Sequence, residues 1–231
     1  MTNTEKKYGL GIHTSSPELG LAITDFAEDI RWQTWNLGRD LSTHLHQKLQ
    51  EFLSPQTWQD LSFIAVAKGP GSFTGTRIGI VTARTLAQQL NIPLFAISTL
   101  AAVAWSYKNQ DRNLSLQMQG QRNQLFTAIY QLEEMGMNSL LEETLMTPEV
   151  WEETLKNWQN SYELIKVENA LGSSVLSLLE LAHLEWQKGK RSHWSAALPF
   201  YGQHPIIERG SMAAGRDVTY NVLQRSKHQN N

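Results

Sequence analysis

Hydrophobic positions change their spacing along the first hundred residues. Short apolar runs at 8–13, 19–26 and 30–36 are separated by turn-forming residues and predict three strands. The connections between these runs are too short to cross over a sheet, so the three strands should form an antiparallel meander.

The spacing then becomes helical. Apolar residues recur every three or four positions over 41–53, which predicts an amphipathic helix. After it we expect a strand at 62–67, a helix at 75–90, a strand at 94–97 and a helix from about Thr99. Strands joined by helices pair in parallel, so this half predicts a mixed sheet.

A polar stretch at 109–113 predicts a boundary. Beyond it, the pattern predicts strands at 114–119, 125–132, 139–146 and 162–167, with helices at 148–158 and 173–188. We therefore expect an α/β protein with two subdomains, 1–108 and 109–201, each with a mixed sheet flanked by helices. Residues 202–231 form a polar tail that we expect to be partly disordered.

Composition narrows the function classes. A net charge of -2 does not suggest wholesale binding to nucleic acid, and the absence of cysteine removes disulfides, thiolate catalysis and Cys-ligated zinc. The N-terminus lacks a signal-peptide pattern, and no uncharged run approaches the ~20 residues of a membrane span. We expect a soluble, cytoplasmic protein.

The most informative segment is a glycine-rich turn between the strand at 62–67 and the helix at 75–90. Its residues are Gly69, Pro70, Gly71, Ser72, Phe73, Thr74 and, after Gly75, Arg77. A strand, glycine turn and helix can cradle phosphate, but the lysine of a P-loop is missing and the glycine spacing of a dinucleotide-binding turn is not met. A tight turn that lets a strand and a helix pack closely is the favoured interpretation.

The helix after the turn has one smooth face, because Gly75, Gly79, Ala83 and Ala87 lie four residues apart. The stripe either packs inside the domain or contacts another chain, and we predict a partner interface shared with the helix at 41–53. The predicted interface residues are Leu41, Leu45, Leu49, Phe52, Gly75, Ile78, Gly79, Thr82, Ala83 and Leu86.

No pattern predicts a catalytic or metal site. His44 and His46 are two residues apart and point to different sides of a helix, and no His-x-x-x-His occurs. Ser72 does not lie in a Gly-x-Ser-x-Gly nucleophile turn. We therefore predict neither catalytic residues nor metal ligands.

The motifs resemble those of one family. The turn together with Arg77-Ile78-Gly79 resembles the hallmark of the TsaB (YeaZ) family, the bacterial non-catalytic partners of the threonylcarbamoyl-transferase TsaD. Further resemblances lie at Gly11 to Ser15, Asn91 to Leu94, Ile97 to Leu100, Phe126 to Tyr130 and Pro199 to Tyr201.

This resemblance implies an actin-like ATPase (RNase H-like) fold with two subdomains. It also implies a subunit that has no activity of its own, supports formation of N6-threonylcarbamoyladenosine in tRNAs reading ANN codons, and binds a TsaD-like transferase or a second copy through the helices at 41–53 and 75–90. The resemblance further implies that a TsaE-like ATPase joins the complex, that ATP or ADP binds at the complex interface, and that the chain contacts tRNA only indirectly, through the complex.

Two positions depart from the family pattern. The acid that ends its first strand is His13 here, and the acid that opens its second-domain hairpin is Gln119. Carboxylates suit Mg²⁺ better than imidazole or amide groups do. Both changes argue against the main alternative, a nucleotide-binding ATPase or phosphotransferase of the actin-like superfamily. The missing histidine pair argues against a third, a metallopeptidase.

Overall fold

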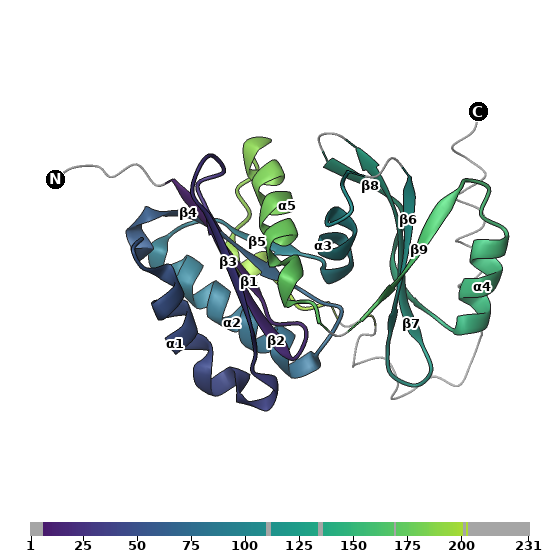
Figure 1. Cartoon of the computed structure of the whole chain (residues 1–231), viewed down its shortest axis with the longest axis horizontal. Coiled ribbons are helices and arrows are strands. Elements are labelled where there is room, and N and C mark those ends of the chain that lie inside the picture. The colour runs from purple at the N-terminus through teal and green to yellow at the C-terminus, as the bar shows by residue number, and fades with distance from the viewer. Residues whose placement is uncertain (1–6, 110–111, 134–135, 169, 201, 203–231) are drawn as a thin grey trace.

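The computed structural model of this chain describes residues 7–109, 112–133, 136–168, 170–200 and 202. The described elements form five layers, with two sheets that alternate with three layers of helices (Figure 1). Helices α1 and α2 cover the outside of the first sheet, α3 and α5 lie between the sheets, and α4 covers the outside of the second (Figure 1). The predicted disorder after Gly202 lies outside the described residues.

The first sheet has five strands in the order β3-β2-β1-β4-β5. The strands are β1 (Tyr8–His13), β2 (Glu18–Thr24), β3 (Ile30–Asn36), β4 (Leu61–Ala67) and β5 (Leu94–Ile97). The first three pair antiparallel, while β4 pairs parallel with β1 and β5 parallel with β4. The predicted meander and mixed sheet are thus confirmed.

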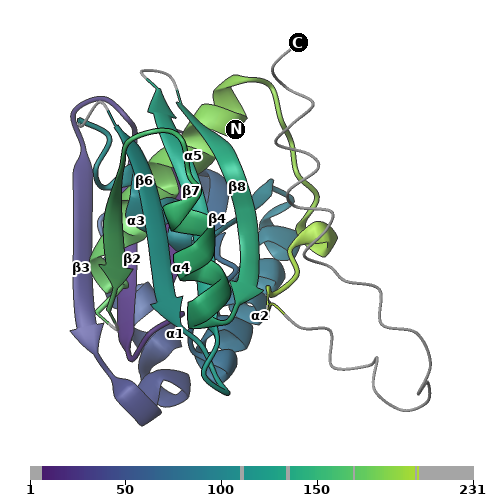
Figure 2. The same cartoon turned by 90° about the vertical axis from the view of Figure 1, so that its right-hand side faces the viewer.

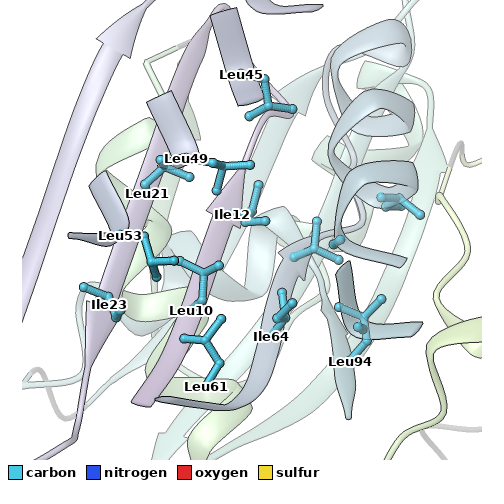
Figure 3. Packing of buried hydrophobic residues seen from close by; sticks show 14 of the residues in the cluster. Leu10, Ile12, Leu21, Ile23, Leu45, Leu49, Leu53, Leu61, Ile64 and Leu94 are labelled. Carbon is cyan, nitrogen blue, oxygen red and sulfur yellow. The ribbon is translucent and has the colours of Figure 1, made fainter. Parts of the chain in front are cut away.

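Alternate residues of β1 lie on opposite faces of this sheet. Leu10 and Ile12 point toward α1 (Leu41–Leu53) and α2 (Phe73–Leu90) and join the largest core cluster, part of which Figure 3 shows. Gly9 and Gly11 face the other side, where a Cβ atom at Gly11 would press on Val175 and Leu179 of α5, and one at Gly9 would press on Phe63, Phe26 and Leu179. The missing side chains let α5 lie close to β1.

The middle layer consists of α3 (Thr99–Trp105) and α5 (Val175–Gln187). The order of elements predicts that the helix at 173–188 belongs to the second unit, but α5 packs against β1, β2, β4 and β5 of the first sheet and against α3. Its apolar residues Val175, Leu178 and Leu179 are buried against Phe63 and Ala65. Spacing along a sequence cannot tell which of two sheets a helix covers.

The second sheet has four strands in the order β8-β7-β6-β9. Its strands are β6 (Asn113–Gln119), β7 (Leu125–Glu133), β8 (Gly136–Met146) and β9 (Tyr162–Val167), and α4 (Pro148–Lys156) precedes β9. β9 pairs parallel with β6, and the other pairs are antiparallel. Two mixed sheets flanked by helices are the α/β class that the sequence predicts.

Short 3₁₀ turns complete the chain: η1 (Gly38–Asp40), η2 (Trp58–Asp60), η3 (Gly172–Ser174) and η4 (Trp194–Ala196). Among the described residues, no helix combines the length and apolar character that crossing a membrane requires. Helix α2 begins two residues before the predicted Gly75, because Ser72 caps its first turn through a side-chain hydrogen bond to the Gly75 amide.

Candidate functional site

The glycine turn lies directly against the turn that joins β1 to β2, residues 14–17, which we call the β1–β2 turn. A Cβ atom at Gly71 would overlap the Ser15 carbonyl oxygen, and one at Gly75 would overlap the Thr14 carbonyl oxygen. One at Gly79 would overlap Thr14 Oγ1. Glycine at these three positions therefore lets the segment from Gly71 into α2 lie so close to Thr14 and Ser15 that a Cβ atom would clash.

Hydrogen bonds fix this contact. The Ser72 amide donates to the Ser15 carbonyl at 2.7 Å, Thr76 Oγ1 donates to Ser15 Oγ at 3.0 Å, and Thr14 Oγ1 donates to the Gly75 carbonyl at 2.8 Å. Within α2, the amides of Gly75 and Thr76 donate to Ser72 Oγ and Ser72 O. The amides of Ser72, Gly75 and Thr76 are thus engaged inside the chain, which disfavours a phosphate cradle.

The other side of the β1–β2 turn holds the segment that returns from the second sheet. The Leu171 amide donates to Ser16 Oγ at 3.4 Å, and the Gly172 amide donates to Glu18 Oε2 at 3.0 Å. A Cβ atom at Gly20 would overlap the Gly172 carbonyl. The β1–β2 turn is therefore clamped between α2 and the start of α5.

In the structure, the predicted interface residues face the interior of this chain. Eight of the ten are buried, each either at most 8% exposed or a buried glycine, and Ile78 and Leu86 are partly buried against the same core. The four α1 residues Leu41, Leu45, Leu49 and Phe52 pack on the first sheet, and Thr82 and Ala83 are buried in α2. Internal packing was the alternative that the sequence left open. Whether α1 and α2 meet a partner stays a prediction, but the contact has to use their outward faces.

A different set of α2 side chains faces outward. Phe73 is 51% exposed and Val81 is 62% exposed, and the Arg77 guanidinium lies 5.2 Å from the Phe73 ring centroid. With the exposed Thr74 and Thr85 they form what we call the outward face of α2. Val81 is not among the predicted interface residues, although an apolar residue on the side opposite the glycine stripe is a usable signal.

Within the predicted motif turn, Gly69 and Pro70 are buried, while Gly71 and Ser72 are exposed.

The two positions that depart from the family pattern hold no carboxylate. His13 is fully buried at the end of β1, and neither ring nitrogen has a hydrogen-bond partner. Burial lowers the pKa of His13 to about 4, so its imidazole is neutral at neutral pH. The Gln119 side chain is exposed at the end of β6 and donates to the Gly120 carbonyl.

These residues do not fit a Mg²⁺-nucleotide. A neutral imidazole and an uncharged amide stand in place of the carboxylates that bind Mg²⁺ best. In the part of the chain that the structure describes, no group of three or more His, Cys, Asp or Glu side chains could hold a metal ion.

A polar cluster connects the two sheets. Tyr130 on β7 donates a 2.8 Å hydrogen bond from its hydroxyl to Glu143 on β8, and the Lys68 ammonium that follows β4 acts electrostatically on the same carboxyl. The backbone of Lys68 is held in place by a hydrogen bond, because its main-chain carbonyl accepts from the Phe200 amide at 2.7 Å. Burial raises the pKa of Glu143 to about 7, and the hydrogen bond from Tyr130 and the charge of Lys68 lower it in part. No pattern in the sequence predicts that Lys68 lies near Tyr130 and Glu143.

Comparison with known proteins decides the family. The family model described as TsaD, tRNA N6-adenosine threonylcarbamoyltransferase, matches residues 39–192. A curated relative from Bacillus subtilis, tRNA threonylcarbamoyladenosine biosynthesis protein TsaB, is 38% identical over 156 residues. The chain belongs to this family, among its TsaB (YeaZ) members.

That alignment covers 64% of this chain and 65% of the B. subtilis TsaB, so it spans less than two thirds of the relative. The TsaB from Buchnera aphidicola of the pea aphid is 28% identical over 143 residues, which are 56% of this chain and 64% of the relative. The glycine turn and the two helices around it lie within the region matched by the family model.

Solved structures show the same fold. YeaZ from Pseudomonas aeruginosa superposes with a TM-score of 0.69 at 22% identity, over 84% of this chain and 99% of that one. A second P. aeruginosa structure, described as similar to peptidase YEAZ, gives 0.72 at 20% identity over 85% and 100%. The two-sheet fold expected from the TsaB resemblance is confirmed.

The buried glycine stripe yields a stability prediction for this TsaB-family chain. We expect Gly75→Ala to lower the free energy of unfolding of the isolated chain by about 1–3 kcal/mol, because the new methyl group meets the Thr14 backbone carbonyl, which cannot swing away. Chemical denaturation of the variant measures this loss. The exposed neighbour Thr74→Ala is the control and should change little. A Gly75→Ala chain that is as stable as the natural one, yet no longer binds a partner, would contradict internal packing.

The carboxyl of Glu143 yields a pH prediction. The folded chain binds its proton with a pKa of about 7, against 4.5 for an ordinary glutamate. Between these values the folded state holds more protons than the unfolded state, so the contribution of Glu143 to stability is full below pH 4.5 and is lost as the pH rises through 7. We expect Glu143→Gln to flatten the fall in stability over this range. Denaturant unfolding at several pH values tests this, with the exposed neighbour Glu142→Gln as control. Equal pH profiles for Glu143→Gln and the natural chain would refute it.

Proposed function

We propose that this chain is a non-catalytic subunit required for forming N6-threonylcarbamoyladenosine in tRNA, and that it binds and activates a TsaD-like transferase. Family membership and the printed names of its relatives support the pathway. The observation that carries the non-catalytic role is the site itself. Its glycine turn is engaged in internal packing, and His13 and Gln119 stand where nucleotide-handling acids are expected.

Activation requires no contact with the reacting atoms. A subunit that binds the competent conformation of a transferase more tightly than the other conformations raises the population of the competent one. Only a difference in affinity between conformations is needed. The rigid contact between α2 and the β1–β2 turn suits this role, because it presents a surface of fixed shape.

The outward face of α2 is the surface that we assign to the partner. It exposes Phe73 and Val81 beside Arg77, and residues 73–90 contain no aspartate or glutamate. An apolar centre with a basic neighbour fits a partner patch that is apolar and has an acidic rim. The transferase takes this face in the active complex, and a second copy of this chain takes it when the transferase is missing.

The remaining components follow from the same proposal. A TsaE-like ATPase joins the complex, and ATP or ADP binds at the interface with a partner and not within this chain alone. The complex acts on tRNA, so we place the protein in the cytoplasm.

Partner binding should depend on Val81. We expect Val81→Glu to weaken co-elution with the TsaD-like transferase at least about tenfold while leaving the melting temperature nearly unchanged, because the side chain is 62% exposed. The control is Leu140→Glu, another exposed apolar residue, which lies on β8 of the second sheet. Size-exclusion chromatography and thermal melts of both variants give the answer. Undiminished co-elution of Val81→Glu would remove the outward face of α2 as the interface.

The pathway is tested by reconstitution. We expect purified TsaC-, TsaD- and TsaE-like proteins to make N6-threonylcarbamoyladenosine only when this chain is added, as measured by nucleoside mass spectrometry of tRNA. The chain alone, with ATP and Mg²⁺, should not turn over nucleotide. Modification that proceeds equally well without the chain, or an ATPase activity that follows the chain through purification, would contradict the proposal.

A further inference from the structure

The segment after α5 crosses an edge of the first sheet. Residues 187–194, which we call the basic strap, lead from the end of α5 along β5 to α2 on the other face, and Figure 2 shows this path along one side of the molecule. The Leu94 amide of β5 donates to the Ser192 carbonyl at 3.1 Å, and η4 contacts α2. The strap is therefore anchored at both ends and is not a loose loop.

Positive side chains concentrate on the strap. Lys188, Lys190 and Arg191 are all exposed. One carboxylate, Glu185, pairs with both lysines, at 3.3 Å from Lys188 Nζ and 2.7 Å from Lys190 Nζ. Three cations next to one acid leave a local positive excess in a chain whose net charge is -2.

Contacts within the chain hold the Arg191 side chain in one position. Its guanidinium lies 4.7 Å from the Trp186 ring centroid, and Nη1 donates to the carbonyls of Trp186 and Lys190 at 2.8 Å each. Among the described residues, no acceptor is recorded for its other three N–H groups. A guanidinium that is already ordered loses less conformational entropy when it binds an anion.

A second arginine is arranged in the same way where the strap reaches α2. The Arg84 guanidinium lies 5.6 Å from the Trp194 ring centroid, and His193 packs against the same ring with centroids 4.9 Å apart. The surface thus combines cations with aromatic side chains and extends from the end of α5 to α2.

We propose that the basic strap binds the phosphate backbone of the tRNA that the complex modifies. This inference rests on the proposed function, and it replaces the expectation that the chain contacts tRNA only indirectly, through the complex. Exposed lysine and arginine side chains with ordered guanidinium groups are the means by which proteins hold nucleic-acid phosphates. A protein partner is the weaker alternative, because protein interfaces have an apolar centre and are depleted in lysine, and no large apolar residue of the strap is exposed.

The strap positions tRNA without reading its sequence. Lysine and arginine contacts to phosphate are independent of the base, so the strap adds affinity equally for every tRNA that the complex accepts. Discrimination between tRNAs is left to the transferase.

The test uses the full-length chain assembled with its TsaD-like transferase. The probe is a fluorescently labelled, unmodified transcript of a tRNA that reads an ANN codon, and its affinity is measured by anisotropy over a range of salt concentrations. The strap variant is K188Q/K190Q/R191Q. The control is R112Q/K156Q/K166Q, which removes three positive charges around the second sheet: Arg112 lies just before β6, Lys156 at the end of α4 and Lys166 on β9.

For the strap variant we expect tRNA affinity at low salt to fall roughly tenfold or more and the slope of log K against log salt to become shallower by about 2–3. The control should change both far less. Unchanged affinity and slope, or an equal loss in the control, would overturn the proposal. Loss of co-elution with the transferase would also overturn it, because the strap would then be a protein contact. Failure of the proposed function is seen separately, when the natural chain neither co-elutes with the transferase nor supports modification.

Discussion

The contact between the β1–β2 turn and α2 is the constraint on which the rest of the structure depends. Thr14 and Ser15 are buried polar residues at the end of the central strand, and a buried polar group is tolerated only when it is hydrogen-bonded. Their partners are the Gly75 carbonyl, the Ser72 amide and the Thr76 hydroxyl, and these groups come close enough only where α2 carries glycine. On its other side the same turn holds Leu171 and Gly172, which lead into α5. One turn thereby fixes helices on both faces of the first sheet.

This constraint also bears on function. A glycine-rich turn before a helix is the place where many folds bind phosphate, but here the Ser72, Gly75 and Thr76 amides have acceptors inside the chain. Beside it, His13 is buried and neutral where a carboxylate would be needed for a metal ion. The hydrogen-bonded groups of this turn hold α2 against the end of β1. This packing is the reason why we propose that the chain acts by presenting a surface to a partner.

Much of the fold could be predicted from the sequence because it depends on local patterns. The strands at 8–13 and 30–36 and the helix at 41–53 follow from apolar spacing, and the structure has them at the same bounds. The attachment of α5 to the first sheet could not be predicted, since it depends on contacts with Gly9 and Gly11 more than 160 positions away in the chain.

The site was predictable only in part. The glycine stripe identified α2 as a helix with a close neighbour, but spacing cannot say whether that neighbour is the same chain or another. The structure buries Gly75, Gly79 and Ala83 internally and exposes Val81 on the opposite side. The cluster of Lys68, Tyr130 and Glu143 brings together strands and loops of both sheets, and no periodicity in a single sequence carries that information.

Amide hydrogen exchange of the isolated chain, without nucleotide or partner, is the most direct test of the central claim that the glycine turn is an internal packing device. The amides of Ser72, Gly75 and Thr76 have acceptors within the chain, so we expect them to exchange as slowly as amides in the core of β1 and β4. Rapid exchange of these three amides, slowed only when ATP or the transferase is added, would mean that the turn is a ligand or partner site and would contradict the account.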